Sequence, residues 1–288
     1  MQSNNPVFRR SEEFHRSGAN AYGNQTYPGN GGGYPGYGQT DPSTWGTGMP
    51  GTPTHTTDQG RMTIDSVVQK TGMSLGIVIV AALATWILTP EIPPGASIPG
   101  NLLLAVMVGS LGAFALSMVN SFKRVVSPGL VMAFCALEGI ALGALSKVFD
   151  AQFGDGVVSG AVIGTFGAFA GTLAAYKFFD IKVGNKFRMF VIAAVFGMVG
   201  LSLMELVLSM FGASVGLFGF GTLGMLTAIA GLVLGVFMLI LDFDFVEQGI
   251  ANQIPERESW RAAFAMTVSL VWIYTNLLRL LAIFSNND

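Results

Sequence analysis

The sequence predicts an all-α membrane protein of seven transmembrane helices, with a disordered amino-terminal tail. Hydrophobic residues make up 51% of the 288 residues and charged residues only 11%, whereas about a quarter of the residues of a soluble domain are charged. The mean hydropathy is +0.56, although this average includes a long polar segment. Beyond that segment the apolar residues gather in runs of about 20, the length that crosses a bilayer as a helix.

The composition also argues against several functions. The formal net charge is −2 and no basic arm is present, so we expect no nucleic-acid partner. Cys135 is the only cysteine, and both histidines, His15 and His55, precede the apolar runs. The predicted membrane part therefore has no imidazole for a metal, a proton relay or a catalytic triad. There is no P-loop, GxSxG or HExxH motif, so we expect no enzymatic activity and no cofactor.

Residues 1–60 differ in composition from the rest of the chain. They are rich in Gly, Pro, Ser, Thr and Tyr, as in GNGGGYPGYG at 29–38. Such a segment cannot bury enough apolar surface to offset the entropy of ordering. We interpret residues 1–60 as a disordered cytoplasmic tail and residues 61–288 as the membrane domain.

A helix start is predicted at Thr63, which can cap the helix while Asp65 places a negative charge in its first turn. Val67, Val68 and Thr71 are expected to share one face of a short amphipathic segment that leads into the bilayer. The seven predicted spans follow at residues 72–89, 102–120, 129–149, 157–178, 187–211, 221–241 and 262–284. Glycine pairs four residues apart in spans three, four and six predict close helix packing: Gly139 and Gly143, Gly160 and Gly164, Gly167 and Gly171, and Gly231 and Gly235.

The distribution of Lys and Arg predicts the orientation. The connections after spans two, four and six carry most of the basic residues, whereas the alternate connections carry few. By the positive-inside rule the amino terminus lies in the cytoplasm of a bacterial plasma membrane and the carboxyl terminus outside. Arg279, near the far end of span seven, is expected to reach the outer headgroups.

Carboxylates within or beside the spans are the candidate functional residues, because their desolvation is costly and usually tied to function. Glu138 and Glu205 are expected in mid-span, and Asp242, Asp244 and Glu247 cluster at the end of span six. Asp244 has Glu247 and Gln248 as helical neighbours, whereas Asp242 points to another face. Such groups could bind a proton or a hard cation such as Ca²⁺. Structural alternatives remain open: a solvated helix end for Asp242 and Glu247, and for Glu205 a hydrogen bond to a Ser or Thr of a neighbouring helix.

Several segments, taken in order, resemble the transmembrane Bax inhibitor motif family and its bacterial YccA-like members. These segments are ALEGIALG at 136–143, LDFDFVEQGI at 241–250 and SLVWIYTNLLRLLAIF at 269–284. NPVF at 5–8 and MTIDSVVQKTG at 62–72 are similar to an actinobacterial branch. The resemblance implies six helices around a central seventh, and a pH-sensitive calcium leak in some members.

The resemblance also implies a pair of aspartates on spans six and seven that opens and closes the path by protonation. Asp244 matches the span-six aspartate, and Ser269 occupies the span-seven position, so the pair is incomplete in this chain. The leading hypothesis is a passive cation pathway for Ca²⁺, lined by Asp244 and Glu138 and modulated by protonation. The alternative is an adaptor that binds a membrane protease or another membrane protein through its tail and loops, without transport.

Overall fold

The computed structural model describes residues 60–93, 96–154 and 156–286, so residues 1–59 of the predicted tail lie outside the described residues. The described residues form seven α-helices and one short 3₁₀ helix, with no β-strand. These are α1 Ile64–Leu88, α2 Gly100–Phe122, α3 Pro128–Phe153, α4 Val157–Phe178, α5 Asn185–Met210, α6 Thr222–Ala251, η4 Glu256–Glu258 and α7 Ser259–Ser285. All seven α-helices are long and apolar enough to cross a membrane, as the sequence predicts.

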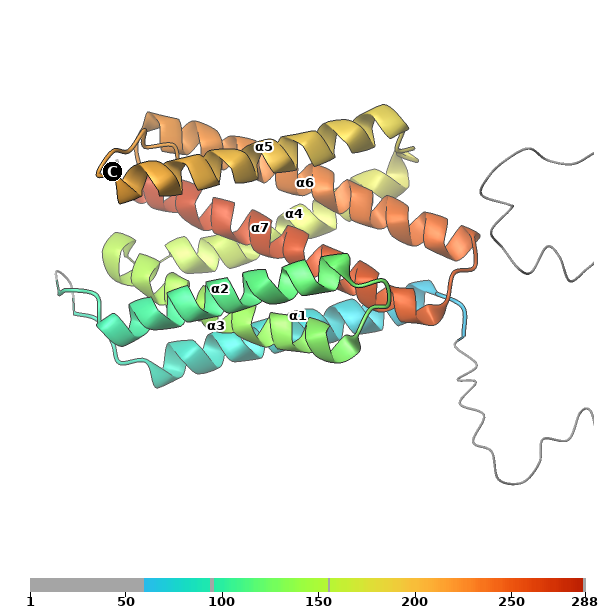
Figure 1. The fold of residues 1–288 in the computed structure, drawn as a ribbon, viewed down its shortest axis with the longest axis horizontal. Helices are drawn as coiled ribbons and strands as arrows, with labels where there is room; N and C mark the ends of the chain where they lie inside the picture. The colour runs from blue at the N-terminus through green and yellow to red at the C-terminus, as the bar shows by residue number, and fades with distance from the viewer. Residues whose placement is uncertain (1–59, 94–95, 155, 287–288) are drawn as a thin grey trace, which may run out of the picture. The chain divides into compact units, whose positions relative to one another are not determined.

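The helices of residues 60–286 run up and down, and α7 passes through the middle of the bundle (Figure 1). α7 packs against α1, α3, α4 and α6, while α2 packs mainly on α3 and α5 mainly on α6. We call the end with the α2–α3, α4–α5 and α6–α7 connections the basic end, because the Lys and Arg residues gather there. The opposite end, with the α1–α2, α3–α4 and α5–α6 connections, is the far end.

The first helix begins where the sequence predicts. The Thr63 side chain accepts a hydrogen bond from the Ser66 backbone, and the Ser66 side chain accepts one from the Thr63 backbone, which forms a capping box. The amphipathic segment is not a separate element, because α1 continues without a break to Leu88. Val67 and Thr71 are buried, but Val68 is 64% exposed, so the prediction that it shares their face is wrong.

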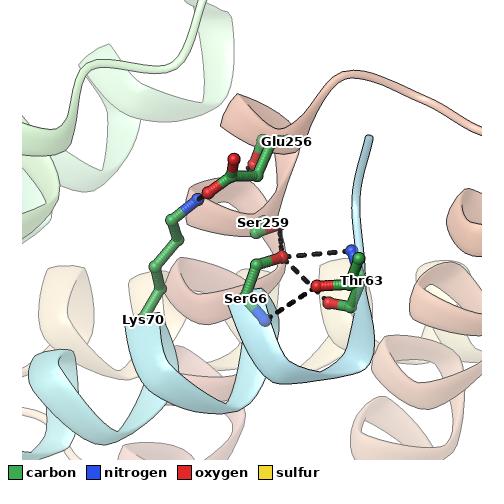
Figure 2. A network of polar contacts seen from close by, with 5 residues as sticks. All are labelled: Thr63, Ser66, Lys70, Glu256 and Ser259. Carbon is green, nitrogen blue, oxygen red and sulfur yellow. Dashed lines mark hydrogen bonds and ion pairs between the residues drawn. The ribbon is translucent and has the colours of Figure 1, made fainter. Parts of the chain in front are cut away.

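A polar network joins the start of α1 to the start of α7 (Figure 2). The Ser66 and Ser259 hydroxyls lie 2.7 Å apart. The Lys70 ammonium group donates to the Glu256 carboxylate at 2.9 Å. Backbone hydrogen bonds add to this contact, with Met62 donating to the Ile254 carbonyl. The segment that precedes α1 is thereby fixed to the α6–α7 connection at the basic end.

Most of the predicted glycine contacts are present. A β-carbon at Gly139 or Gly143 would overlap the α1 backbone at Val78 or Ala82, so α1 and α3 can approach this closely only with glycine there. Gly231 and Gly235 bring α6 equally close to Asn276 and Ile273 of α7, and Gly160 and Gly164 face leucines of α7. Nothing lies within 4 Å of a β-carbon built at Gly167 or Gly171, so that pair does not form the predicted contact.

Candidate functional site

The carboxylate of Asp242 faces α7. The Ser269 hydroxyl, which is 1% exposed, donates a hydrogen bond of 2.6 Å to Asp242 Oδ2. Asp242 itself is half-buried, and no ion pair joins it to any described residue. Asp242 therefore lies at the interface of α6 and α7 with a neutral partner, and the alternative of a solvated helix end is wrong for this residue.

Asp244 lies on a different face of α6 and pairs with a cation. Its Oδ2 atom is 2.8 Å from the Arg188 guanidinium of α5 and accepts a hydrogen bond from Gln248 at 2.7 Å. The predicted neighbour relation of Asp244 and Gln248 is thus confirmed. The expectation that Ser269 stands opposite Asp244 is wrong, because Ser269 contacts Asp242. Asp244 follows Asp242 by two positions, and successive residues differ by about 100° around a helix. The two side chains therefore lie on different sides of α6.

Glu247 belongs to the surface beside Asp244. Its side chain is exposed and accepts a hydrogen bond of 2.5 Å from the Tyr176 hydroxyl of α4. Tyr176, Asp180, Asp244 and Glu247 line a polar pocket of about 310 Å³ near the α4–α5 connection, at the basic end. No group of three or more His, Cys, Asp or Glu side chains in the described parts of the chain is arranged to hold a metal ion.

Glu138 is half-buried on α3 and has no hydrogen bond or ion pair with a described residue. It lies one helical turn from Phe134 and one from Leu142, both of which pack into the core with Tyr274 and Leu278 of α7. Residues four apart share a helix face, so Glu138 leaves α3 on the side that faces the bundle. No contact joins Glu138 to Asp242 or Asp244.

Glu205 has a structural role at the far end. It lies about one turn before the end of α5, not in mid-span. Its carboxylate accepts backbone N–H groups of Val215 at 3.3 Å and Gly216 at 2.9 Å. The predicted alternative of a structural hydrogen bond is therefore correct, but its predicted donor is wrong. The donors are backbone amides of the α5–α6 connection and not a Ser or Thr of a neighbouring helix. Gly216 has a φ of +78°, which favours glycine in this turn.

A row of polar side chains continues from Asp242 along the α6–α7 interface. Trp272 Nε1 donates to the Gly231 carbonyl at 2.8 Å, and Asn276 donates to the Trp272 carbonyl at 2.8 Å. Ser269, Trp272, Asn276 and Arg279 occur at offsets of zero, three, seven and ten residues, which places them along one side of α7. We call this row the α6–α7 polar row.

Arg279 ends the α6–α7 polar row. It donates to the Thr227 hydroxyl at 3.1 Å, and its guanidinium lies 5.1 Å from the centre of the Phe218 ring. The Nε atom is buried without a hydrogen-bond partner, and no ion pair joins Arg279 to a described residue. The guanidinium is therefore held against α6 and the α5–α6 connection at the far end of the bundle.

Arg188, Tyr176 and Thr227 were not among the predicted site residues. Arg188 contributes to the basic character of the α4–α5 connection, which hides its ion pair with Asp244. The only sequence signal for that pair is an aspartate between apolar residues near the basic end of α6. Such an aspartate needs a cation or a proton if it is buried. Tyr176 and Thr227 give no such signal, because each is an uncharged polar residue within a predicted span.

Comparison with known proteins identifies the family to which the chain belongs. The sequence model of the family described as Bax inhibitor 1 like matches residues 5–286. No curated protein matches the chain. The family match covers nearly the whole chain, and the described residues contain seven helices long and apolar enough to cross a membrane. The chain is therefore a multi-pass membrane protein that belongs to the Bax inhibitor 1-like family.

Proposed function

We propose that this protein is a passive, proton-modulated pathway for cations, with Ca²⁺ as the ion, and that it carries out no enzymatic reaction. The observation that carries the proposal is the state of two carboxylates in the helical bundle. Asp242 has only the Ser269 hydroxyl as a partner, and Glu138 has no polar partner among the described residues. A carboxylate within a membrane span has a high desolvation cost when no cation accompanies it. A passing cation would supply the missing charge.

Asp244 has a different part in this proposal. Its ion pair with Arg188 already supplies the opposite charge, so it attracts a further cation less strongly than Asp242 does. We therefore assign Asp242, and not Asp244, as the pathway residue of span six. The polar pocket beside Asp244 and Glu247 lies near the basic end and would serve as the entrance on that side.

Proton modulation follows from the charge of Asp242. A protonated carboxyl group is neutral, so it no longer offsets the desolvation of a cation in the bundle. A proton and a cation then compete for the same group. Ca²⁺ prefers oxygen ligands such as carboxylates and hydroxyls, which Asp242 and Ser269 provide at one position.

Ca²⁺ influx into vesicles tests the proposal. Purified full-length protein in liposomes that contain a Ca²⁺ indicator is expected to admit Ca²⁺ faster than protein-free liposomes. Glu138→Gln is expected to lower the initial rate about tenfold, because the loss of about 1.4 kcal/mol of electrostatic stabilisation of a divalent ion near the path corresponds to a factor of ten in rate. Glu91→Gln is the matched control, since Glu91 is an exposed carboxylate in the α1–α2 connection.

Two results would contradict the proposal. Influx equal to that of protein-free liposomes, for every variant, would remove the pathway and favour the alternative function of a membrane adaptor. An equal effect of Glu138→Gln and Glu91→Gln would show that the influx does not depend on the carboxylate within the bundle.

The orientation belongs to the same proposal. We propose that the basic end faces the cytoplasm of a bacterial plasma membrane, because the α2–α3, α4–α5 and α6–α7 connections at that end carry most of the Lys and Arg residues. Reporter fusions after Lys123 and after Arg188 are expected to read cytoplasmic, and a fusion after Pro94 is expected to read external. The reverse pattern would overturn the orientation.

A further inference from the structure

We propose that a cavity between α1 and α4 is a binding site for one acyl chain of a membrane phospholipid, whose phosphate group lies beside Lys147. We call this cavity the lateral slot. The inference goes beyond the proposed function and does not depend on it, because none of the carboxylates assigned to the cation pathway lines the slot.

The lateral slot has a volume of about 340 Å³, which lies within the range of sites for small molecules. α1 and α4 form its two sides and, among the described residues, scarcely touch each other. α3 and α7 form its back, to which Ser146 and Tyr274 contribute. The slot is therefore a space that the bundle leaves between two helices which both pack on α7.

The slot is open on the side of the bilayer. Ile79 and Leu83 on α1, and Val162 and Phe166 on α4, line the slot and are exposed. Residues four apart share a helix face, so each of these pairs forms one rim of the opening. Both helices are long and apolar enough to cross a membrane. The medium at the rims is therefore lipid hydrocarbon.

The length of the slot matches one leaflet. Its lining on α1 runs from Leu75, near the middle of the helix, to Trp86, near the far end. These eleven residues correspond to about 16 Å along the helix axis, and half of the hydrocarbon core is about 15 Å thick. The lining on α4 runs from Val158 to Phe166, in the far-end half of that helix. One acyl chain of the far-end leaflet therefore fits along the slot.

The hydroxyl groups of the lining are already paired within the protein. Ser146 donates to the Leu142 carbonyl at 2.5 Å, so the Tyr274 hydroxyl, 2.6 Å from Ser146 Oγ, is the donor of that contact. Thr165 donates to the Ala161 carbonyl at 2.7 Å. The slot is thus an apolar space, and such a space favours hydrocarbon over water or an ion.

Lys147 indicates where the headgroup lies. Its ammonium group donates to the carbonyls of Trp86 at 2.9 Å and Thr89 at 2.5 Å, and it lies 5.6 Å from the centre of the Trp86 ring. Lys147 is 7% exposed, and no ion pair joins it to a carboxylate in the described parts of the chain. A lysine has three N–H donors, so one remains for a phosphate. Basic groups between membrane helices bind lipid headgroups in this way.

Photocrosslinking in the membrane tests the site. The full-length protein is placed in vesicles of dioleoylphosphatidylglycerol that contain a small fraction of the same lipid with a diazirine at mid-chain. Labelled residues are then located by mass spectrometry. Leu270 and Tyr274 of the central helix α7 line the slot but are only 4% and 9% exposed. Label at these two residues is expected, because the slot connects them with the bilayer.

Val162→Trp is expected to lower the label on α7 at least about fivefold relative to the label on the outer face of α5, because an indole in the opening leaves no room for a chain. Ile79→Trp, on the opposite rim, is expected to give the same loss. Ile163→Trp is the matched control, since Ile163 is 72% exposed and lies outside the slot lining. Its α7 label is expected to equal that of the unmodified protein.

A second probe tests the phosphate. Dioleoylglycerol with the same diazirine has the same chains but no phosphate. The phosphatidylglycerol probe is expected to label α7 about tenfold more strongly than this probe, a factor typical of one charge-assisted hydrogen bond. Lys147→Gln is expected to abolish the difference between the probes, and Lys147→Arg is expected to preserve it.

Three outcomes would overturn the proposal. Label on α7 that is absent in the unmodified protein, or equal in Val162→Trp and Ile163→Trp, would show that no acyl chain occupies the slot. Absence of the label together with a dimer in native mass spectra would assign the slot to an interface between two copies of the chain. Equal labelling by the two probes in the unmodified protein would remove the phosphate from Lys147.

Discussion

Replacing Ser269 with aspartate is expected to make the pH dependence of Ca²⁺ flux clearly steeper. Ser269 donates to Asp242 at 2.6 Å, so an aspartate at position 269 would set two carboxylates at hydrogen-bond distance. Two such groups cannot both be charged without strong repulsion, and they take up and release a proton as a coupled unit. Flux measured across a range of pH values checks this expectation against the unmodified protein.

The controls for this substitution follow from the same geometry. Asparagine has nearly the size of aspartate but no titratable group. The pH profile of Ca²⁺ flux through Ser269→Asn is therefore expected to resemble that of the unmodified protein. Adding Asp242→Asn to Ser269→Asp is expected to remove the gain, because the coupled partner is lost. If Asp244→Asn removes the gain while Asp242→Asn does not, the two carboxylates that interact are not the ones identified at the α6–α7 interface.

The sequence was sufficient for the helices because membrane spans are encoded locally. A run of about 20 apolar residues must be helical in hydrocarbon, since every backbone polar group has to be satisfied within the segment. The span at 157–178 has the same limits as α4. α6 is the exception, because it extends ten residues beyond the predicted limit at 241. Its carboxylates do not end the helix, since Ser269, Arg188 and Gln248 provide their hydrogen bonds.

The partners of the carboxylates could not be predicted in the same way. Helical periodicity shows that Asp242 and Asp244 point in different directions, but it does not say which of them faces α7. The register between α6 and α7 decides this, and Gly231 and Gly235 set that register through close contacts with Asn276 and Ile273. The resemblance that places Ser269 at the span-seven position carries no information about this packing.

Charge pairs between helices are similarly hidden in a single sequence. Arg188 and Asp244 are 56 residues apart, and Arg188 has an equally good explanation as a basic residue near a membrane surface. Arg279 has the same ambiguity, because a long cationic side chain near a helix end usually extends to the headgroups. Its contacts with Thr227 and Phe218 depend on how α7 packs against α6 and the α5–α6 connection.

Asp242→Asn is expected to have the largest effect on cation flux of any single carboxylate substitution. The substitution removes the charge at a position where no protein cation compensates it, so the attraction for a passing ion is lost in full. We expect the initial Ca²⁺ rate to fall at least about tenfold. Asp244→Asn removes a charge that Arg188 already offsets, so the net attraction for Ca²⁺ changes less.

The most direct test of the central claim is therefore the initial rate of Ca²⁺ influx into liposomes that contain Asp242→Asn or Asp244→Asn, at matched amounts of folded protein. The account predicts that Asp242→Asn lowers the rate close to that of protein-free liposomes, while Asp244→Asn retains most of it. Normal influx through Asp242→Asn together with loss of influx in Asp244→Asn would contradict the account, because the ion would then depend on the aspartate paired with Arg188 and not on the one that faces Ser269.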